Sequence, residues 1–457
     1  MMSASATAKA NLTRAIALAA ISTFVVAAAP GKCGLQVLPQ HDPNSSSHLA
    51  QIGISADGRF LTFASYAPLL RDDTNERSDI YVFDMNTRQL TMESALADGN
   101  PPHADSFGPD ISDDGRFLVF HSSGRSSPGG GYDPTLQIIL RDRQRDVTTV
   151  LSANESGARG NADSSGAAIS GDGRVVAFES HATNLVPGAD ANGAAFDVYA
   201  VTVATGAIVR VSTTSTGRQH AAGASFGPSI SADGQRIAFT STASLDEEQV
   251  GSGRRPMKSQ PLQPNTERRN VFVRDLAGDT TRRISRSRRG DPDGPSYLPA
   301  ISDDGRWIAF VSEASDLLPG DDNELPDVFL HDLHTWKASL VSGSASGKPA
   351  DGASSRPAIS ADGRYVAFES EASNLVCSRR CAARDLDINL LLDVFVFDRS
   401  NGVITRLSTD PESGWMEPSR SPAIDGRGNV IAFSSRRPTD DRDRRGDFDL
   451  FVHRRCE

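Results

Sequence analysis

Residues 299–342, PAISDDGRWIAFVSEASDLLPGDDNELPDVFLHDLHTWKASLVS, form the unit that decides the fold. The unit contains short apolar runs at 299–302, 307–311, 327–330 and 338–341. Runs of this length, bounded by turn residues, predict four β-strands. Asp304-Gly305 separates the first two runs and predicts a tight hairpin turn with both central residues at positive φ. Residues 331–336 should close the third strand onto the fourth in the same way.

The connection between the second and third strands has a different character. Residues 312–326 are mostly polar and rich in acidic side chains. The unit is therefore predicted to be one antiparallel four-stranded sheet, with two short turns at one end and its long loops at the other.

This unit recurs seven times along the chain. The second strand carries a phenylalanine in every copy: Phe63, Phe120, Phe178, Phe239, Phe310, Phe368 and Phe433. The turn before this strand reads SADGRF from residue 55 and SDDGRW from residue 302, and successive turn glycines lie about 57 to 71 residues apart. A regular period of this kind predicts a repeat architecture and not a string of separate domains.

The apolar runs indicate which repeat architecture this is. Residues 365–368 (YVAF) and 394–397 (VFVF) are apolar at every position, so both faces of the sheet must be covered. Four-stranded antiparallel sheets that cover both faces with copies of themselves form a β-propeller. We therefore predict an all-β fold, a single seven-bladed β-propeller over residues 30–457. Its blades are expected near residues 50–98, 99–156, 157–216, 217–288, 289–346, 347–412 and 413–457.

Composition argues against one class of partner. The 457 residues carry a net charge of −11, which does not suit a protein that binds nucleic acid through a uniformly basic surface. Because the repeat accounts for nearly the whole chain, we expect one domain. We also expect a monomer.

Residues 1–29 have the features of a secretory signal. Lys9 and Arg14 give a weakly positive region before an apolar stretch, 15–26, that is too short to span a bilayer. The small residues 27–29 suit cleavage. We expect export to the periplasm or the extracellular space, with no membrane span in the mature chain. An uncleaved N-terminal anchor is the alternative.

The four cysteines are read as two pairs, as expected in an exported chain. The seventh repeat ends after its third strand, and residues 34–38 (GLQVL) form a strand-like segment without a repeat of its own. We expect this segment to supply the missing outer strand and a Cys33–Cys456 disulfide to staple the closure. The alternative is that Cys33 is free or lipidated. Cys377 and Cys381, in the loop CSRRC, could form a second, local bridge.

The repeats resemble a known family. The unit SADGRYVAFES, which begins at residue 360, is similar to the PD40 or TolB-like repeat, a WD40-like β-propeller repeat, and the resemblance covers about residues 50 to 455. It implies the propeller fold. The sequence departs from the family in two respects, because residues 33–51 leave no room for the α/β domain of TolB, and the usual proline before the turn aspartate is absent. We therefore do not transfer the role or the partners of TolB.

Four of the long loops share an Asp-x-Asn motif followed by an aspartate at the start of the third strand. These candidate metal ligands are Asp73, Asn75 and Asp79; Asp190, Asn192 and Asp197; Asp321, Asn323 and Asp327; and Asp387, Asn389 and Asp393. Closely spaced oxygen donors of this kind suit Ca²⁺, and the pattern is similar to the calcium loops of FG-GAP repeats. The alternative is that the same side chains form Asx-turns and bond loop amides.

Other motifs carry less weight. Residues 223–227 (GASFG) match the GxSxG nucleophile elbow but precede a propeller strand, where no strand-to-helix turn is expected. His331 and His334 are expected at an exposed turn. Two groups of arginines are predicted on the long loops: Arg282, Arg283, Arg286, Arg288 and Arg289; and Arg254, Arg255, Arg268 and Arg269. They could hold an anionic polysaccharide or peptide carboxylates, or be solvated loop residues.

No catalytic motif lies in a credible context, and no cofactor other than Ca²⁺ is indicated. We therefore expect a non-catalytic binding module or scaffold that holds a protein or glycan on its long-loop face. The alternative is an extracellular polysaccharide lyase or hydrolase with its site at the mouth of the propeller.

Overall fold

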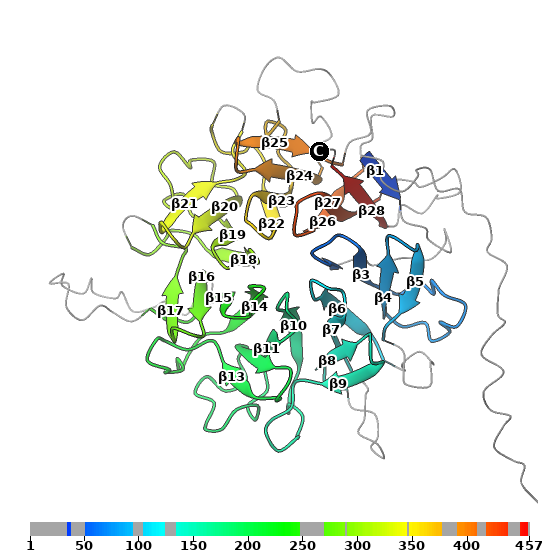
Figure 1. Cartoon of the computed structure of the whole chain (residues 1–457). Coiled ribbons are helices and arrows are strands. Elements are labelled where there is room, and N and C mark those ends of the chain that lie inside the picture. The colour runs from blue at the N-terminus through cyan, green and yellow to red at the C-terminus, as the bar shows by residue number, and fades with distance from the viewer. Residues whose placement is uncertain are drawn as a thin grey trace, which may run out of the picture.

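The computed structural model describes residues 34–37, 51–94, 104–123, 134–246, 269–287, 290–344, 347–376, 391–408, 417–436 and 448–455. These residues form seven four-stranded sheets arranged radially around one axis, which is the predicted seven-bladed β-propeller (Figure 1). Within the described ranges there is no helix of the length and apolarity needed to cross a membrane.

The strands of each blade are given from the innermost to the outermost. Blade 1 has β2 (Ile52–Ile54), β3 (Phe60–Ser65), β4 (Asp79–Asp84) and β5 (Gln89–Met92), and blade 2 has β6 (Ser106–Ile111), β7 (Phe117–Ser122), β8 (Gln137–Asp142) and β9 (Val147–Val150). Blade 3 has β10 (Ser164–Ile169), β11 (Val175–Ser180), β12 (Asp197–Thr202) and β13 (Ile208–Arg210), and blade 4 has β14 (Ser225–Ile230), β15 (Arg236–Ser241), β16 (Asn270–Asp275) and β17 (Thr280–Arg283). Blade 5 has β18 (Ser296–Ile301), β19 (Trp307–Ser312), β20 (Asp327–Asp332) and β21 (Lys337–Leu340), and blade 6 has β22 (Ser354–Ile359), β23 (Tyr365–Ser370), β24 (Asp393–Asp398) and β25 (Val403–Arg406). Blade 7 has β26 (Ser419–Ile424), β27 (Val430–Ser435), β28 (Asp449–Arg454) and β1 (Gly34–Val37).

The N-terminal strand closes the ring, as predicted. β1 pairs antiparallel with β28, with Gly34 opposite Arg454 and Val37 opposite Phe451. Leu35 packs against the apolar residues between blades 6 and 7. Blade 7 is thus built from both ends of the described chain. The four cysteines proposed as disulfide partners, Cys33, Cys456, Cys377 and Cys381, lie outside the described residues.

The turn between the first two strands differs from the predicted two-residue type. In blade 5, Gly305 has φ of 66°, whereas Asp304 is not among the residues with positive φ. The Asp304 side chain accepts hydrogen bonds from the Ser302 hydroxyl at 2.5 Å and the Arg306 amide at 2.9 Å. These bonds hold the aspartate as a turn cap in ordinary backbone geometry, so only the glycine needs the left-handed region.

The turn glycines also make contacts between blades. The first residue of each second strand packs on the turn glycine of the following blade, as Trp307 does on Gly363. A Cβ on Gly363 would lie 2.7 Å from Trp307 Cβ, which is closer than packed atoms approach. Trp307 is further covered by the guanidinium groups of Arg306 and Arg399, at 4.7 and 3.9 Å from its ring centre. The glycine therefore provides space as well as conformational freedom.

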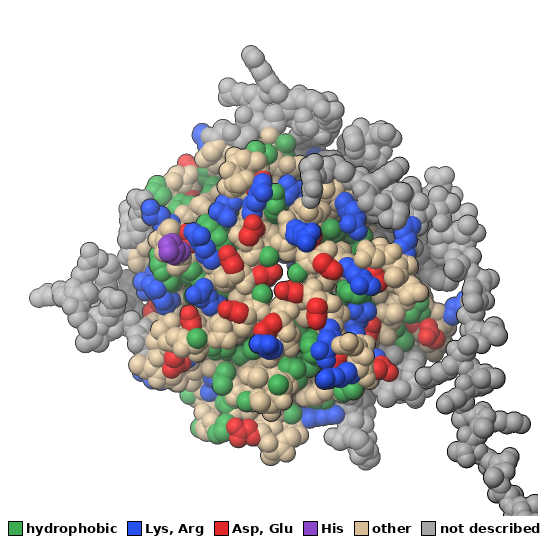
Figure 2. Space-filling model, viewed as in Figure 1, with side chains coloured by type: hydrophobic (Ala, Val, Ile, Leu, Met, Phe, Trp, Pro, Cys, Tyr) green, Lys and Arg blue, Asp and Glu red, His purple; other side chains and the backbone are tan. Residues whose placement is uncertain are grey.

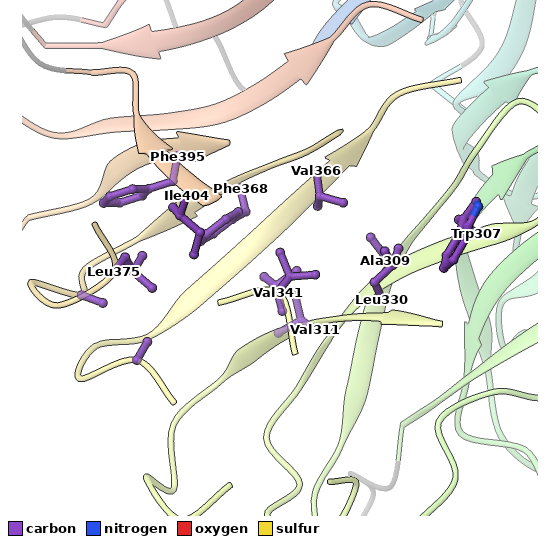
Figure 3. Packing of buried hydrophobic residues seen from close by; sticks show 13 residues of the cluster. Trp307, Ala309, Val311, Leu330, Val341, Val366, Phe368, Leu375, Phe395 and Ile404 are labelled. Carbon is purple, nitrogen blue, oxygen red and sulfur yellow. The ribbon is translucent and has the colours of Figure 1, made fainter. Parts of the chain in front are cut away.

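The core lies between the blades. Every second-strand phenylalanine is buried, and in blade 5 Phe310 stacks on Phe329 of the neighbouring strand with ring centres 5.8 Å apart. Figure 3 shows apolar side chains of blades 5 and 6, among them Val311 and Phe368, packed into one layer. Both faces of each sheet are covered in this way, which is why the strands are apolar at consecutive positions.

The inner strands carry a bulge in blades 2 to 7. The pairing with the second strand shifts register after the second residue of the inner strand, for example between Tyr297 and Ala300 in blade 5. The third residue is left-handed in each of these strands: Gly108, Gly166, Gly227, Leu298, Arg356 and Ser421. Inner strands run from the long-loop face to the short-turn face, so the bulges lie at the long-loop end. We call this end of the inner strands, with the loop residues beside it, the rim.

The short-turn end of the axis is tied together by backbone. Hydrogen bonds link turns of neighbouring blades, as between the Ala232 amide and the Asp303 carbonyl at 3.0 Å. In the view along the propeller axis of Figure 2, acidic side chains surround the centre of the visible face and basic side chains lie further out. Burial, and then the charges of Asp113, Asp304 and Asp110, raise the pKa of Asp303 to about 7.

Candidate functional site

The predicted metal loops differ from blade to blade. In blade 1, Asp73 is buried and accepts a hydrogen bond from the Tyr81 hydroxyl, while Asn75 Nδ2 donates to Asp79 at 2.8 Å. Asp79 also accepts from the Ser94 hydroxyl at 2.5 Å. Both carboxylates therefore have hydrogen-bond donors from the protein itself.

In blade 3 a side-chain amide lies among the three predicted ligands. Gln219 Nε2 lies 2.8 Å from Asp190 Oδ1 and 2.7 Å from oxygens of Asn192 and Asp197, so its two hydrogens are shared among three acceptors. Arg210 NH2 is 3.2 Å from Asp190, and Arg210 Nε is 3.4 Å from Asp197. The positive charge and the amide donor satisfy this loop without a metal.

The loops of blades 5 and 6 complete the set. In blade 5, Asn323 Nδ2 donates to Asp327 at 2.8 Å, as in blade 1, and Asp321 is buried nearby. In blade 6 the third-strand residue Asp393 is 2.5 Å from Arg406 NH2. The other two predicted ligands of blade 6, Asp387 and Asn389, lie outside the described residues.

The aspartate at the start of the third strand has a structural role that needs no charge. It accepts a hydrogen bond from a serine after the fourth strand, as Asp327 does from Ser342 at 2.5 Å. Gln137 and Asn270 occupy the same position in blades 2 and 4 and accept the corresponding serine hydrogen bonds at 2.6 and 3.1 Å. Among the described residues no three His, Cys, Asp or Glu side chains are grouped so that they could hold a metal. Calcium binding stays a prediction, and the turn interpretation accounts for most of these contacts.

The serine in the GxSxG match is part of the repeat. Ser225 begins β14, an inner strand, and its hydroxyl donates to Ser241 at 2.8 Å. The same pair recurs in other blades, for example Ser296 with Ser312 at 2.8 Å. Ser225 is buried and there is no strand-to-helix turn, so it does not form a nucleophile elbow.

The predicted basic cluster of blade 4 is largely neutralised. Arg282 and Arg283 belong to β17 and not to the following loop. Arg283 is 2.8 Å from Asp246, and the Arg282 guanidinium lies 3.3 Å from the Trp336 ring centre. Arg286 also contacts Asp246, at 3.3 Å. Of the other predicted arginines, Arg269 is described and exposed, whereas Arg254, Arg255, Arg268, Arg288 and Arg289 lie outside the described residues.

Of the two histidines of blade 5 that were predicted to be exposed, His334 is exposed and His331 is not. β20 continues to Asp332, so His331 lies within the strand and is buried, and only His334 is exposed on the turn. Burial lowers the pKa of His331 to about 4. His331 is therefore a neutral core residue near neutral pH.

A different set of arginines lies at the rim, in blades 6 and 7. We call Arg356, Arg420 and Arg436 the arginine cluster. Arg420 and Arg436 share the ring of Phe448, with guanidinium carbons 3.6 and 4.8 Å from its centre. Burial, and then the charges of Arg356 and Arg436, lower the pKa of Arg420.

The arginine cluster has one carboxylate neighbour. Glu369 is buried and lies 3.3 Å from Arg356 Nε. Its oxygens also accept hydrogen bonds from the Ser355 hydroxyl at 2.9 Å and the Ser421 amide at 2.8 Å. Neither Arg420 nor Arg436 has a side-chain hydrogen bond or ion pair to any described residue. Among the described residues, these two guanidinium groups are therefore held by stacking on Phe448, and their donors make no hydrogen bond.

Aromatic side chains occupy the rim in other blades. Tyr66 is 40% exposed, and its ring centre lies 5.9 Å from that of Phe107 on β6. In blades 4 and 5, Phe226 has the Arg269 guanidinium 5.6 Å from its ring centre, and the Tyr297 hydroxyl donates to Glu313 at 2.8 Å. The rim thus combines partly exposed rings with cationic groups.

Sequence reasoning missed the arginine cluster because its members are scattered along the chain. Arg356 and Arg420 occupy the third and second positions of two inner strands, and Arg436 follows β27. A signal was available, since the inner strands of blades 2 to 5 have aromatic residues or serine at the second position and glycine or leucine at the third, so that arginine stands out.

Comparisons with known proteins bear on the fold. No family model matches the sequence, and no curated protein does either. The chain is similar in structure to oligogalacturonate lyase from Vibrio parahaemolyticus, with a TM-score of 0.55 and 14% identity over 95% of this chain and 97% of that one. It is also similar to the β-propeller domain of the Trilobed protease from Pyrococcus furiosus, with a TM-score of 0.51 and 10% identity over 89% and 93% of the two chains. TolB from Acinetobacter baumannii aligns with a TM-score of 0.37 and 14% identity over 88% of this chain and 78% of that one. At these identities the first two likenesses concern the fold alone, and the third is too weak to support an argument.

Proposed function

We propose that the rim of the propeller is a non-catalytic binding site for an acidic glycan, that is, a polysaccharide whose sugars carry carboxylates. The observation that carries this proposal is the arginine cluster, in which Arg420 and Arg436 are stacked on Phe448 and make no hydrogen bond or ion pair to a carboxylate among the described residues.

The chemistry of the rim matches such a ligand. A guanidinium fork binds a carboxylate through two parallel hydrogen bonds, and a hydrogen bond to a charged group contributes about 1.5 to 3 kcal/mol. Stacking on Phe448 orients the two forks in advance, which lowers the entropy lost on binding. Exposed rings such as Tyr66 offer apolar faces on which sugar rings can rest. The chain as a whole has a net charge of −11, so an anion should be attracted only locally.

A lyase is the second candidate, because the structurally similar enzyme from Vibrio parahaemolyticus acts on a carboxylated oligosaccharide. Elimination requires a general base at the sugar, and the described rim residues offer few. Glu369 already accepts hydrogen bonds at both oxygens. His121 is mostly buried beside Phe107, and burial lowers its pKa to about 4. Binding without turnover is therefore the better proposal.

Binding of the purified full chain to polygalacturonate, compared with neutral galactan, tests the proposal. Calorimetry should detect binding of polygalacturonate but not of neutral galactan. Arg420→Ala and Arg356→Ala should each weaken the binding of polygalacturonate about tenfold or more, in line with the loss of one charge-assisted contact. Arg174→Ala is the matched control, since Arg174 is an exposed arginine whose side chain is 83% accessible and which follows a turn glycine. Equal binding of both polymers, or equal effects of all three substitutions, would refute the proposal.

Turnover is measured in the same samples. Unsaturated products absorb in the ultraviolet, so a steady rise in absorbance that is lost in Arg420→Ala would establish the lyase alternative. Export, to the periplasm or the extracellular space, is also proposed, on the basis of the signal features of residues 1–29. Cell fractionation with detection of the shortened chain is the corresponding test.

A further inference from the structure

The third residue of the inner strands divides the rim into two arcs. The backbone is left-handed at this position in blades 2 to 7, and glycine occupies it in blades 2, 3 and 4. Blade 5 has Leu298 instead, with φ of 52°, and blade 6 has Arg356, with φ of 48°. A bulky side chain in this conformation is an outlier, because it strains a backbone that glycine adopts without strain.

Packing in the core does not account for the strained leucine. Leu298 is 43% exposed, and the other exposed aliphatic residues on the described strands, Val147, Val209 and Val403, all belong to outer strands. Tyr297 packs between blades 5 and 6, but Leu298 belongs to none of the buried apolar clusters in the described part of the chain. Backbone strain that the core does not explain points to a functional contact.

The neighbours of Leu298 along this arc are polar. Arg356 takes the same position in β22, the inner strand of the next blade around the ring (Figure 1), and its Nε lies 3.3 Å from Glu369. Ser421 takes this position in blade 7, and its amide donates to Glu369 at 2.8 Å. An exposed apolar side chain therefore lies at the blade 5 end of the arginine cluster.

We propose that Leu298 is a specificity-determining contact for the acidic glycan, and that it packs on the apolar face of the sugar whose carboxylate Arg356 binds. This inference rests on the function proposed for the rim. A uronate ring offers both features, because its C–H groups form an apolar face and its carboxylate projects from the ring edge. Glycine leaves blades 2 to 4 without a side chain at this position, so the ligand is placed over blades 5 to 7.

Calorimetric titration of the full chain with polygalacturonate tests the inference. Leu298→Gly should weaken binding about threefold to tenfold, which corresponds to covering the exposed part of one leucine. This loss should be the same at low and high salt, whereas the loss in Arg356→Ala should shrink as salt screens the charge. Gly227→Leu is the matched control, because it places a leucine at the same position of blade 4, where a Cβ meets no atom within 4 Å.

Thermal unfolding without the polymer separates a ligand contact from a packing role. Leu298→Gly relieves strain and removes no core side chain, so its midpoint should not fall. Gly227→Leu introduces strain and should lower the midpoint by about 2 °C, with unchanged binding.

A lower midpoint together with unchanged binding in Leu298→Gly would overturn the inference and leave the proposed function of the rim intact. Equal weakening of binding by Gly227→Leu would overturn the placement over blades 5 to 7. Absence of polygalacturonate binding to the wild type would instead overturn the proposed function on which the inference rests.

Discussion

Replacement of Gly363 by alanine should destabilise the protein much more than the same replacement of Gly402. Both glycines are left-handed, with φ of 65° and 72°, so alanine should cost about 1 to 2 kcal/mol of backbone strain at either position. The two positions differ in what a Cβ would meet. No atom lies within 4 Å of a Cβ on Gly402, whereas at Gly363 the Cβ would overlap Trp307 of the preceding blade.

The overlap at Gly363 cannot be relieved by a small side-chain movement, because it involves Trp307 Cβ itself, at 2.7 Å. Trp307 is also held between Arg306 and Arg399. Overpacking of this kind costs typically about 1 to 3 kcal/mol. Gly363→Ala is therefore expected to lower the free energy of unfolding by about 2 to 5 kcal/mol, against about 1 to 2 kcal/mol for Gly402→Ala.

Urea denaturation of the two variants and the wild type measures the difference. Trp307→Ala in the Gly363→Ala background removes the two ring atoms that a Cβ on Gly363 would approach most closely and leaves only the contact with the Cβ of residue 307, so the double variant should show a coupling energy that restores part of the loss. Equal destabilisation by the two glycine substitutions, or strict additivity with Trp307→Ala, would show that there is no close steric contact between the blades at this turn.

Three further predictions follow from the fold. Ser225→Ala should lower stability by about 1 kcal/mol, the value of one hydrogen bond, and leave any turnover of glycans unchanged, which an assay of both on one sample can check. The Asp303 carboxyl keeps its proton up to about pH 7 in the folded protein, whereas in the unfolded chain it releases the proton near pH 4. Between these values the folded state binds more protons than the unfolded state. The unfolding midpoint should therefore fall as the pH rises through this window. Asp303→Asn should flatten that fall, and a melt series in which it has no effect would contradict the assignment. Deletion of residues 1–38 exposes the edge of β28 and should give an aggregating, destabilised protein in light scattering and thermal melts, whereas deletion of residues 1–32 should not.

The sequence by itself determined the fold class, the number of blades and the closing strand. These features depend on local signals. Apolar runs such as 394–397 specify strands buried on both faces, the turn glycines mark the connections, and the repetition of the unit leaves radial closure as the way to cover each sheet. The segment from Gly34 could be assigned because one strand was missing from the seventh repeat, and β1 fills that place.

Only the tertiary structure decided which of the repeated motifs are chemically alike. The four Asp-x-Asn loops look equivalent in sequence, but Asp190 meets Arg210 and Gln219 while Asp73 accepts a hydrogen bond from the Tyr81 hydroxyl, because the partners come from other strands and loops of the blade. In the same way, Arg420 and Arg436 become neighbours only when β26 and β27 pair and Phe448 packs beside them. Charge compensation and binding surfaces depend on distances between residues remote in sequence, and periodicity carries no information about those distances.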